Sequence, residues 1–367
     1  MWPTKEQQFI LSFLRSSLGY EPWEGVTSTM SQNLDWDKVA AMASHHGIAP
    51  LLFNALQKNK QIILPQKVTE CLTREFISNS ALGLLFEKAL KEIVTHLKQN
   101  KLCFAVHKGL GLAALVYPKP ELRPCGGDFD LLIKKEDYAR AKSLLEAIGY
   151  SLLHPAYEQY EMNYIGEVKF VKPNGGKKLM VELHVEFNAN PWAKVSGFDF
   201  KDFWDNLLWV NYNDFSIPCL PAEANLFFLI LHCAANHNFD RLMMFCDIDL
   251  LIRKYENAID WKRIANYARE KHCRKVFYYC LAYCQQLLGT PAPDSFLEKL
   301  NPGFFSNLLL PTRLLLARDG LQPKSLKKYM HVFLLDKPFL FYKSVGIFLR
   351  RSYSEYLIKK KTGASFS

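Results

Sequence analysis

The feature that most constrains the fold is an apolar run with two aspartates one residue apart, Asp128–Ile133. Alternate side chains of a β-strand share a face, so we expect Asp128 and Asp130 to point to one side while Phe129 and Leu131 point into a core. Neighbouring carboxylates repel each other unless positive charge lies between them. Mg²⁺ prefers one or two carboxylates together with phosphate oxygens. The pattern therefore predicts a buried strand with a metal-dependent phosphoryl- or nucleotidyl-transfer site.

A second strand is predicted over residues 179–187, where polar and apolar side chains alternate cleanly and Glu182 and His184 share the polar face. It follows an apolar stretch at 168–171 and Asn174-Gly175, which together indicate a β-hairpin. The alternative for Glu182 and His184 is the solvated face of that hairpin.

A hairpin beside the Asp128 strand would bring Glu182 within metal distance of both aspartates. We therefore predict that Asp128 and Asp130 are shared ligands of Mg²⁺ or Mn²⁺. Glu182 is predicted to bind the catalytic metal and is the candidate base for the incoming nucleophile.

The phosphate-binding residues are expected upstream of the aspartates. Residues 102–106 read as a short buried strand, and Lys108-Gly109 then leads into a helix. A glycine turn at a helix N-terminus exposes backbone N–H groups, and a lysine adds charge that suits a triphosphate. Arg123 and Gly127, which also precede Asp128, are further candidates. The alternative for the Lys-Gly turn is an ordinary strand-to-helix connection.

These motifs together resemble the uncharacterised nucleotidyltransferase family of the DNA polymerase β-like superfamily. The residues that carry the resemblance are Lys108-Gly109, Arg123, Asp128–Ile133, Ile148-Gly149-Tyr150, Glu182-Leu183-His184, Leu231-His232, His237 and Asp247–Leu251. The resemblance extends over most of the chain from about residue 35 onward. It implies a small mixed sheet with flanking helices and Mg²⁺-dependent transfer of a nucleoside monophosphate from an NTP, with ATP among the candidate donors.

The chain departs from the superfamily pattern at one place. The first motif normally has a serine or a second glycine after its glycine, whereas this chain reads Gly109-Leu110, and the gap to Asp128 is longer than usual. This departure motivates an alternative, a degenerate member that binds nucleotide or a partner without turnover. The acceptor stays open between a small molecule, a protein and RNA.

Coarse periodicity predicts a central α/β module between two helical regions, and together with the small mixed sheet that the resemblance implies, this predicts an α+β fold. The expected regions are a helical N-terminal region at 1–99, an α/β nucleotidyltransferase core at 100–220, and a helical C-terminal region with a basic tail at 221–367. One long helix or two joined helices are expected over 68–97, and helices again over 222–316.

A second Asp-x-Asp motif, Asp247-Ile248-Asp249, lies among apolar residues at helical spacing. Residues two apart on a helix point in different directions, so these carboxylates are not expected to share a metal. We expect Asp247 to pair with a buried polar partner such as His232 or His237, or to face the cleft. With His184, these residues are secondary site candidates, and a hydrogen-bonded core histidine is the alternative for His232 and His237.

Composition sets the remaining expectations. The chain has 367 residues and a net charge of +10, and no apolar run reaches the ~18 residues of a transmembrane helix. The nine scattered cysteines and the absence of a signal-like start predict a cytoplasmic protein. Ten basic and two acidic residues lie between Lys324 and Lys361, so this tail is expected either to contact RNA, an anionic membrane or an acidic acceptor, or to be a solvated helical end.

Overall fold

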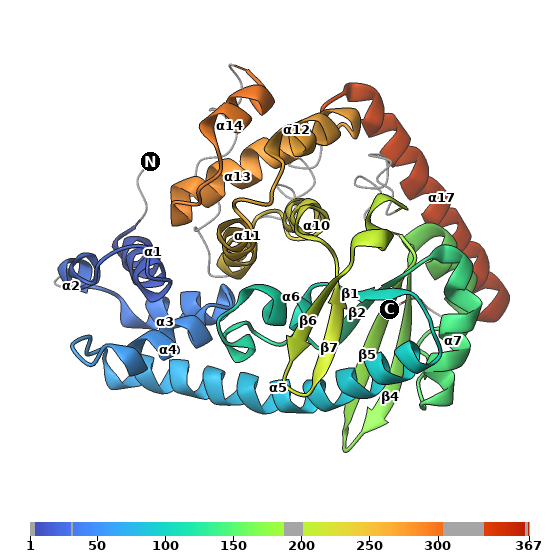
Figure 1. Cartoon of the computed structure of the whole chain (residues 1–367), viewed down its shortest axis with the longest axis horizontal. Helices are drawn as coiled ribbons and strands as arrows, with labels where there is room; N and C mark the ends of the chain where they lie inside the picture. The colour runs from blue at the N-terminus through green and yellow to red at the C-terminus, as the bar shows by residue number, and fades with distance from the viewer. Residues whose placement is uncertain (1–3, 31, 187–200, 304–333, 364–365, 367) are drawn as a thin grey trace. The chain divides into compact units, whose positions relative to one another are not determined.

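The computed structural model describes residues 4–30, 32–186, 201–303, 334–363 and 366. The chain is an α+β protein with one small mixed sheet, as the sequence predicts (Figure 1). In the described part of the chain, no helix combines the length and the apolar character needed to cross a membrane.

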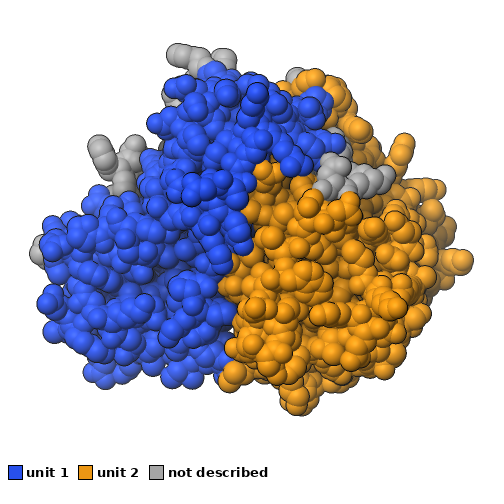
Figure 2. Space-filling view, in the orientation of Figure 1, with its two compact units in different colours: residues 1–82, 116–125, 229–334 blue, residues 83–115, 126–228, 335–367 orange. Residues whose placement is uncertain are grey.

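Two compact units divide the chain, and each is assembled from segments that are separate in the sequence (Figure 2). Unit 1 takes residues 1–82, 116–125 and 229–334, and unit 2 takes residues 83–115, 126–228 and 335–367. The region boundaries expected near residues 99 and 220 stay predictions, because each unit draws on more than one of the three expected regions.

Unit 1 is helical in its described residues. Its helices are α1 (Lys5–Ser17), α2 (Glu24–Met30), α3 (Trp36–His45), α4 (Ala49–Lys58), the start of α5 (Gln66–Gln99), the end of α10 (Ala222–Ala235), α11 (Leu242–Lys254), α12 (Trp261–Glu270), α13 (Arg274–Leu288), α14 (Asp294–Leu300) and the short η1 (Pro120–Leu122). Local signals begin and end several of them. The Thr4 hydroxyl accepts a hydrogen bond from the Gln7 backbone while the Gln7 side chain accepts one from the Thr4 backbone, a capping box for α1. Gly289, with φ of 64°, ends α13.

Two expected helical features are settled in part. The segment 68–97 belongs to one continuous helix, α5, and Asp247 and Asp249 lie on α11, as their spacing predicts. The part of the expected helical stretch at 304–316 lies outside the described residues, as do Lys324, Lys327 and Lys328 of the basic tail.

Unit 2 contains the sheet. The strands are β1 (Phe104–Val106), β2 (Asp128–Ile133), β3 (Ser151–Leu152), β4 (Glu167–Asn174) and β5 (Lys177–His184), with a separate hairpin of β6 (Leu208–Tyr212) and β7 (Phe215–Cys219). The helices are the end of α5, most of α6 (Gly109–Val116), α7 (Tyr138–Ala147), α8 (Glu158–Tyr160), the start of α10 and α17 (Pro338–Thr362), with short turns η2 (Lys135–Asp137), η3 (Pro155–Tyr157), η4 (Glu161–Ile165) and η5 (Lys201–Asn206).

The five-stranded sheet has the order β1-β2-β5-β4-β3. One of its four strand pairs, β2 with β5, is parallel, and the other three pairs are antiparallel. The predicted hairpin is confirmed as β4–β5, and it turns at Gly175 and Gly176, whose φ angles are 54° and 83°. Phe187, the last residue of the expected strand, lies outside the described residues.

One face of the sheet is apolar and packs against the second half of α5. Phe129, Val181 and Phe170 are neighbours across β2, β5 and β4, and all three are buried. Phe86 of α5 packs against Phe129 with tilted rings whose centroids are 4.7 Å apart. This packing directs the alternate residues of the same strands, including both aspartates of β2, to the opposite face.

Candidate active site

The strand register places a row of ionisable side chains across the polar face of the sheet. Asp130 of β2 is paired with Glu182 of β5, and Glu182 is paired with Lys169 of β4. At the end of β1, the His107 backbone N–H donates to the Asp130 carbonyl at 3.1 Å. Directly opposed residues share a face, so these four side chains form one row.

A parallel row flanks the first. His184 of β5 is paired with Leu132 on one side and with Glu167 of β4 on the other. Its Nδ1 lies 3.7 Å from Glu167 Oε2, and its Nε2 lies 3.9 Å from Glu182 Oε2. The polar face thus carries four carboxyl groups, those of Asp128, Asp130, Glu167 and Glu182, against the two ammonium groups of Lys108 and Lys169.

Asp130 is the buried centre of this cluster. Its Oδ1 accepts a hydrogen bond from His184 Nε2 at 3.0 Å and forms an ion pair with the Lys108 ammonium. Burial opposes ionisation, but the Lys108 charge and the His184 hydrogen bond hold the pKa of Asp130 well below its usual value. Conversely, burial lowers the pKa of Lys108, but the charges of Asp130 and Glu182 outweigh this effect and raise it.

Glu182 has a different environment. Lys169 Nζ donates to Glu182 Oε1 at 2.8 Å and lies 3.3 Å from Glu167 Oε1. Burial, reinforced by the neighbouring charges of Glu167 and Asp130, raises the pKa of Glu182. Burial acts to lower the pKa of Lys169, but its contacts with Glu182 and Glu167 raise it overall. A carboxylate with a raised pKa is suited to accept a proton near neutral pH.

Asp128 lies at the first position of β2, next to the glycine pair. Burial and the charge of Asp130 raise the pKa of Asp128. A Cβ atom added to Gly126 would lie 2.8 Å from Asp128 Oδ1, so the absence of a side chain at residue 126 leaves room for this carboxylate. Asp128 and Asp130 share the polar face, as the alternation predicts.

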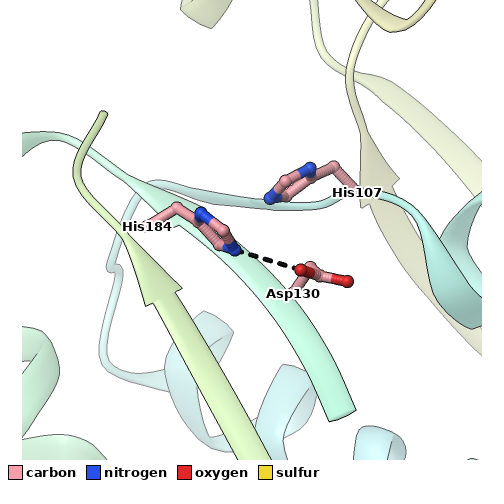
Figure 3. A group of neighbouring side chains, drawn as sticks. All are labelled: His107, Asp130 and His184. Carbon is pink, nitrogen blue, oxygen red and sulfur yellow. Dashed lines mark hydrogen bonds and ion pairs between the residues drawn. The ribbon is translucent and has the colours of Figure 1, made fainter. Parts of the chain in front are cut away.

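His107 and His184 bring two imidazoles to Asp130 (Figure 3). The two rings meet edge to face with centroids 4.6 Å apart, and the other neighbour of His107 is the Phe228 ring at 4.5 Å. Burial lowers the pKa of His107. Burial also acts to lower the pKa of His184, but the hydrogen bond to Asp130 and the charge of Glu167 raise it overall.

The donors on this face fit a divalent cation. Two overlapping groups, His107–Asp130–His184 and Glu167–Glu182–His184, each have one potential ligand atom per residue within 4.8 Å of the others. Carboxylate oxygens suit Mg²⁺ and Mn²⁺, and imidazole nitrogens suit transition metals. Burial and neighbouring carboxylates raise the pKa of Asp128 and of Glu182, so a nearby cation would favour the charged forms of both side chains.

The Lys108-Gly109 turn adjoins the cluster. Lys108 has a φ of 57°, which is uncommon for a residue other than glycine, and its carbonyl accepts the first backbone hydrogen bond of α6, from Leu112 at 2.9 Å. The Cβ position of Gly109 would lie 3.9 Å from the Asp128 carbonyl, so the start of α6 adjoins β2. Lys108, Gly109, Gly127, Asp128, Asp130, Glu182 and His184 therefore all belong to unit 2 and gather at one region of its sheet.

The remaining candidates belong to unit 1. The Arg123 guanidinium forms a two-pronged ion pair with Asp247, with Nε–Oδ1 and Nη2–Oδ2 distances of 3.0 Å. Tyr117 also donates to Asp247, at 2.8 Å, so Asp247 has the buried polar partners that its position on α11 requires. His232 and His237 contact each other with ring centroids 4.8 Å apart. A phosphate role for Arg123 and site roles for the other three stay predictions.

Sequence reasoning missed His107, Glu167 and Lys169. Glu167 and Lys169 alternate on β4 opposite His184 and Glu182, so counting back from the Asn174-Gly175 turn would have found them. His107 immediately precedes Lys108, but no local pattern marks a single histidine at a strand end as a site residue.

A family model described as uncharacterised nucleotidyltransferase matches residues 32–289 of this sequence, which is more than half of the chain. The chain belongs to this family. The match spans every candidate discussed above, from His107 to Asp247, so the polar face of the sheet lies within a nucleotidyltransferase family region. Among curated proteins, no sequence matches this one.

Proposed function

We propose that this protein transfers a nucleoside monophosphate from an NTP to an acceptor, with release of pyrophosphate and with dependence on Mg²⁺ or Mn²⁺. An acceptor oxygen forms a bond to the α-phosphorus, the bond to pyrophosphate breaks, and the acceptor proton passes to the enzyme. The acceptor is a hydroxyl or phosphate group of a small molecule, a protein or RNA.

Asp128, Asp130 and Glu182 are the residues proposed to hold the metal. A bound divalent cation would supply charge neutralisation for the triphosphate and the attacking oxygen. Glu182 is also the proposed base, which accepts the acceptor proton on a carboxylate oxygen. Lys108 and the start of α6 at Gly109, with Gly127 beside Asp128, bind the phosphates. Lys169 positions Glu182 through its hydrogen bond to Oε1.

The observation that carries this proposal is the row Asp130–Glu182, set by the parallel pairing of β2 with β5, with Asp128 at the next position on the same face. Asp130 and Glu182 are 52 positions apart in the sequence, yet they are direct neighbours on adjacent strands. Membership of a nucleotidyltransferase family supports assigning this carboxylate cluster to nucleotidyl transfer.

The test is label transfer and pyrophosphate release by the purified protein. Each of the four NTPs is offered in turn with Mg²⁺ or Mn²⁺, together with small molecules and cell extract as acceptor sources. Asp128→Asn is expected to reduce turnover at least 10²-fold, because it removes a carboxylate from the proposed metal site, while circular dichroism and the melting temperature stay close to those of the unmodified chain. Full activity in this variant would overturn the proposal.

A degenerate, nucleotide-binding role is the second candidate. Lys108 already contacts Asp130, and Lys169 already contacts Glu182, so two proposed metal ligands have internal cationic partners. The missing serine after Gly109 points the same way. Metal-independent nucleotide binding in a calorimetric titration, with no product from any acceptor source, would favour this role over catalysis.

We also propose that α17 binds an anionic lipid surface. One side of this helix packs through Ile358 on the cluster of Tyr157, Tyr160 and Ile165. The opposite side exposes a stripe of large apolar and aromatic side chains, Tyr342, Leu349, Tyr353 and Tyr356, which are 58% to 75% exposed. Exposed cations lie beside the stripe, namely Lys343 and Arg350, and three more follow in the last turns of the helix, Lys359, Lys360 and Lys361. An apolar stripe between cations is the pattern of a helix that lies on an anionic membrane surface.

A further inference from the structure

Three imidazole nitrogens at the polar face of the sheet lack hydrogen-bond partners among the described residues. They are both ring nitrogens of His107 and Nδ1 of His184. His107 is 2% exposed and His184 is 4% exposed, so bulk water does not satisfy them. Buried polar atoms are almost always hydrogen-bonded, and an unsatisfied group commonly marks the place of an ion or an ordered water.

The side chains around these nitrogens limit which kinds of ligand could bind there. Both rings lie beside Asp130 (Figure 3). His184 Nδ1 is 3.7 Å from Glu167 Oε2. Phe228 closes the far side of His107. A ligand beside Asp130 therefore meets the unpartnered nitrogens of His107, the Asp130 carboxylate and His184 Nε2, whose hydrogen bond to Asp130 it would replace. Since the neutral imidazole offers one lone pair and a carboxylate offers several, the set is one of electron-pair donors.

A cation that accepts both nitrogen and oxygen donors fits this set. Mg²⁺ takes oxygen ligands almost exclusively, whereas Mn²⁺, Co²⁺ and Zn²⁺ also bind imidazole, with increasing affinity for nitrogen along the first transition row. One ligand atom from each of His107, Asp130 and His184 lies within 4.8 Å of the others. Two ligands of one ion lie at most roughly twice a 2.0–2.3 Å bond apart, so small side-chain rotations bring all three to one ion.

We propose that His107, Asp130 and His184 form a binding site for a divalent transition metal ion, which this site takes in preference to Mg²⁺. This ligand set shares Asp130 with the metal site of the proposed function but otherwise uses different residues, and the inference rests on that function only for the role of the ion. Metal binding itself is measurable in the absence of nucleotide, acceptor or turnover.

A substitution at Lys108 gives a second test of metal binding at this site. Its ammonium contacts Asp130 and so competes with any cation there. Replacing it with a neutral side chain of similar length, Lys108→Met, is expected to tighten metal binding, because the competing charge is removed.

The experiment uses Co²⁺ as a visible-absorbing probe, titrated into the purified full-length protein, with Mn²⁺, Zn²⁺ and Mg²⁺ measured by calorimetry. The unmodified chain is expected to give a ligand-field absorption band with Co²⁺ and to bind Co²⁺ and Zn²⁺ at least about tenfold more tightly than Mg²⁺. His107→Phe keeps an aromatic ring against Phe228 and is expected to weaken Co²⁺ binding at least about tenfold.

The matched control is His46→Phe, which removes another fully buried histidine, in unit 1. It is expected to leave Co²⁺ binding unchanged, and melting temperatures of both variants verify that each is folded. Equal Co²⁺ affinity in His107→Phe and the unmodified chain would overturn the proposal, as would equal affinity for Mg²⁺ and Co²⁺. Metal binding without any nucleotidyl transfer would leave this inference standing while the proposed function fails. If the protein transfers nucleotide with Mg²⁺ and His107→Phe does not change metal binding, the proposed function would stand and this inference would fail.

Discussion

At the scale of single residues, the pKa values of two neighbouring carboxyl groups in this site are shifted in opposite directions. Asp130 has a cation and a hydrogen-bond donor on its carboxylate, and its pKa is lowered. Asp128, on the same strand face, has the Asp130 charge beside it and a raised pKa. The contrast arises from the partners that each side chain meets, since both are buried to a substantial extent. An added cation beside Asp128 would therefore favour its charged form.

The position of Asp128 depends on a residue without a side chain. In Gly126→Ala, the new Cβ would lie 2.8 Å from Asp128 Oδ1, so the carboxylate must rotate away. The far end of a side chain moves easily, so we expect unfolding free energy to change by less than about 1 kcal/mol while nucleotidyl transfer falls at least about tenfold. Transfer rate and urea unfolding measure the two effects.

The control for this variant is Gly83→Ala in α5, where an added Cβ meets nothing within 4 Å. Alanine at an open helix position is expected to retain full activity and to stabilise the helix by about 0.5–1 kcal/mol. Unchanged transfer in Gly126→Ala would show that the position of the Asp128 carboxylate does not limit the reaction.

At the scale of elements, α17 illustrates how one helix serves two environments. Leu340 is buried and Ile358 packs on the aromatic cluster of unit 2, whereas Tyr342 and Tyr353 on the other side are 75% and 64% exposed. A monomeric soluble protein rarely exposes a contiguous apolar stripe without a binding role. The stripe therefore has the chemistry of a docking surface, and the flanking cations select for negative charge.

Vesicle binding tests this assignment. We expect the full-length protein to sediment with vesicles that contain phosphatidylserine and to release them at high salt, because screening weakens the cation contacts. The double change Leu349→Ser, Tyr353→Ser is expected to weaken binding at least about tenfold, since it removes apolar area from the stripe. The control Ile63→Ser removes an exposed apolar residue from unit 1 and is expected to have no effect. Equal binding to neutral vesicles, or salt-sensitive binding to RNA in place of vesicles, would contradict the lipid assignment.

At the scale of the whole molecule, the stability of the fold depends on pH through buried ionisable groups such as His46. In unit 1, His46 is fully buried, and burial together with the charges of His45 and Arg241 lowers its pKa to about 3. The unfolded chain takes up a proton on this residue near its usual pKa of about 6.5, but the folded chain does not. Protons therefore favour the unfolded state as the pH falls below about 6.5.

Acid stability is expected to show this contribution. Between pH 7 and pH 5, His46 should remove about 2 kcal/mol of unfolding free energy, from a slope of about 1.4 kcal/mol per pH unit. His46→Gln is expected to flatten the dependence, measured by urea unfolding at several pH values. His45→Gln, at the partly exposed neighbouring position, should keep most of the slope. If the two variants retain the same dependence, another group causes the acid sensitivity.

Local patterns determined much of this protein. The alternation along residues 128–133 and 177–184 decides which side chains share a face, because the period of a strand is fixed by its backbone. The Asn174-Gly175 turn sets the β4–β5 hairpin, and helical spacing assigns Asp247 to α11. These features involve residues close together in sequence, so the fold class, both aspartates and the face of Glu182 were predictable.

Only the tertiary structure decided which strands are neighbours and in which register. The parallel pairing of β2 with β5 joins residues about fifty positions apart, and its hydrogen bonds leave no local trace in the sequence. That pairing places Glu182 beside Asp130 and brings in His107, Glu167 and Lys169, which no motif marked. The same reason applies to Arg123, whose ion pair with Asp247 spans two segments of unit 1. Packing of an apolar face and long-range pairing, rather than local propensity, determine these contacts.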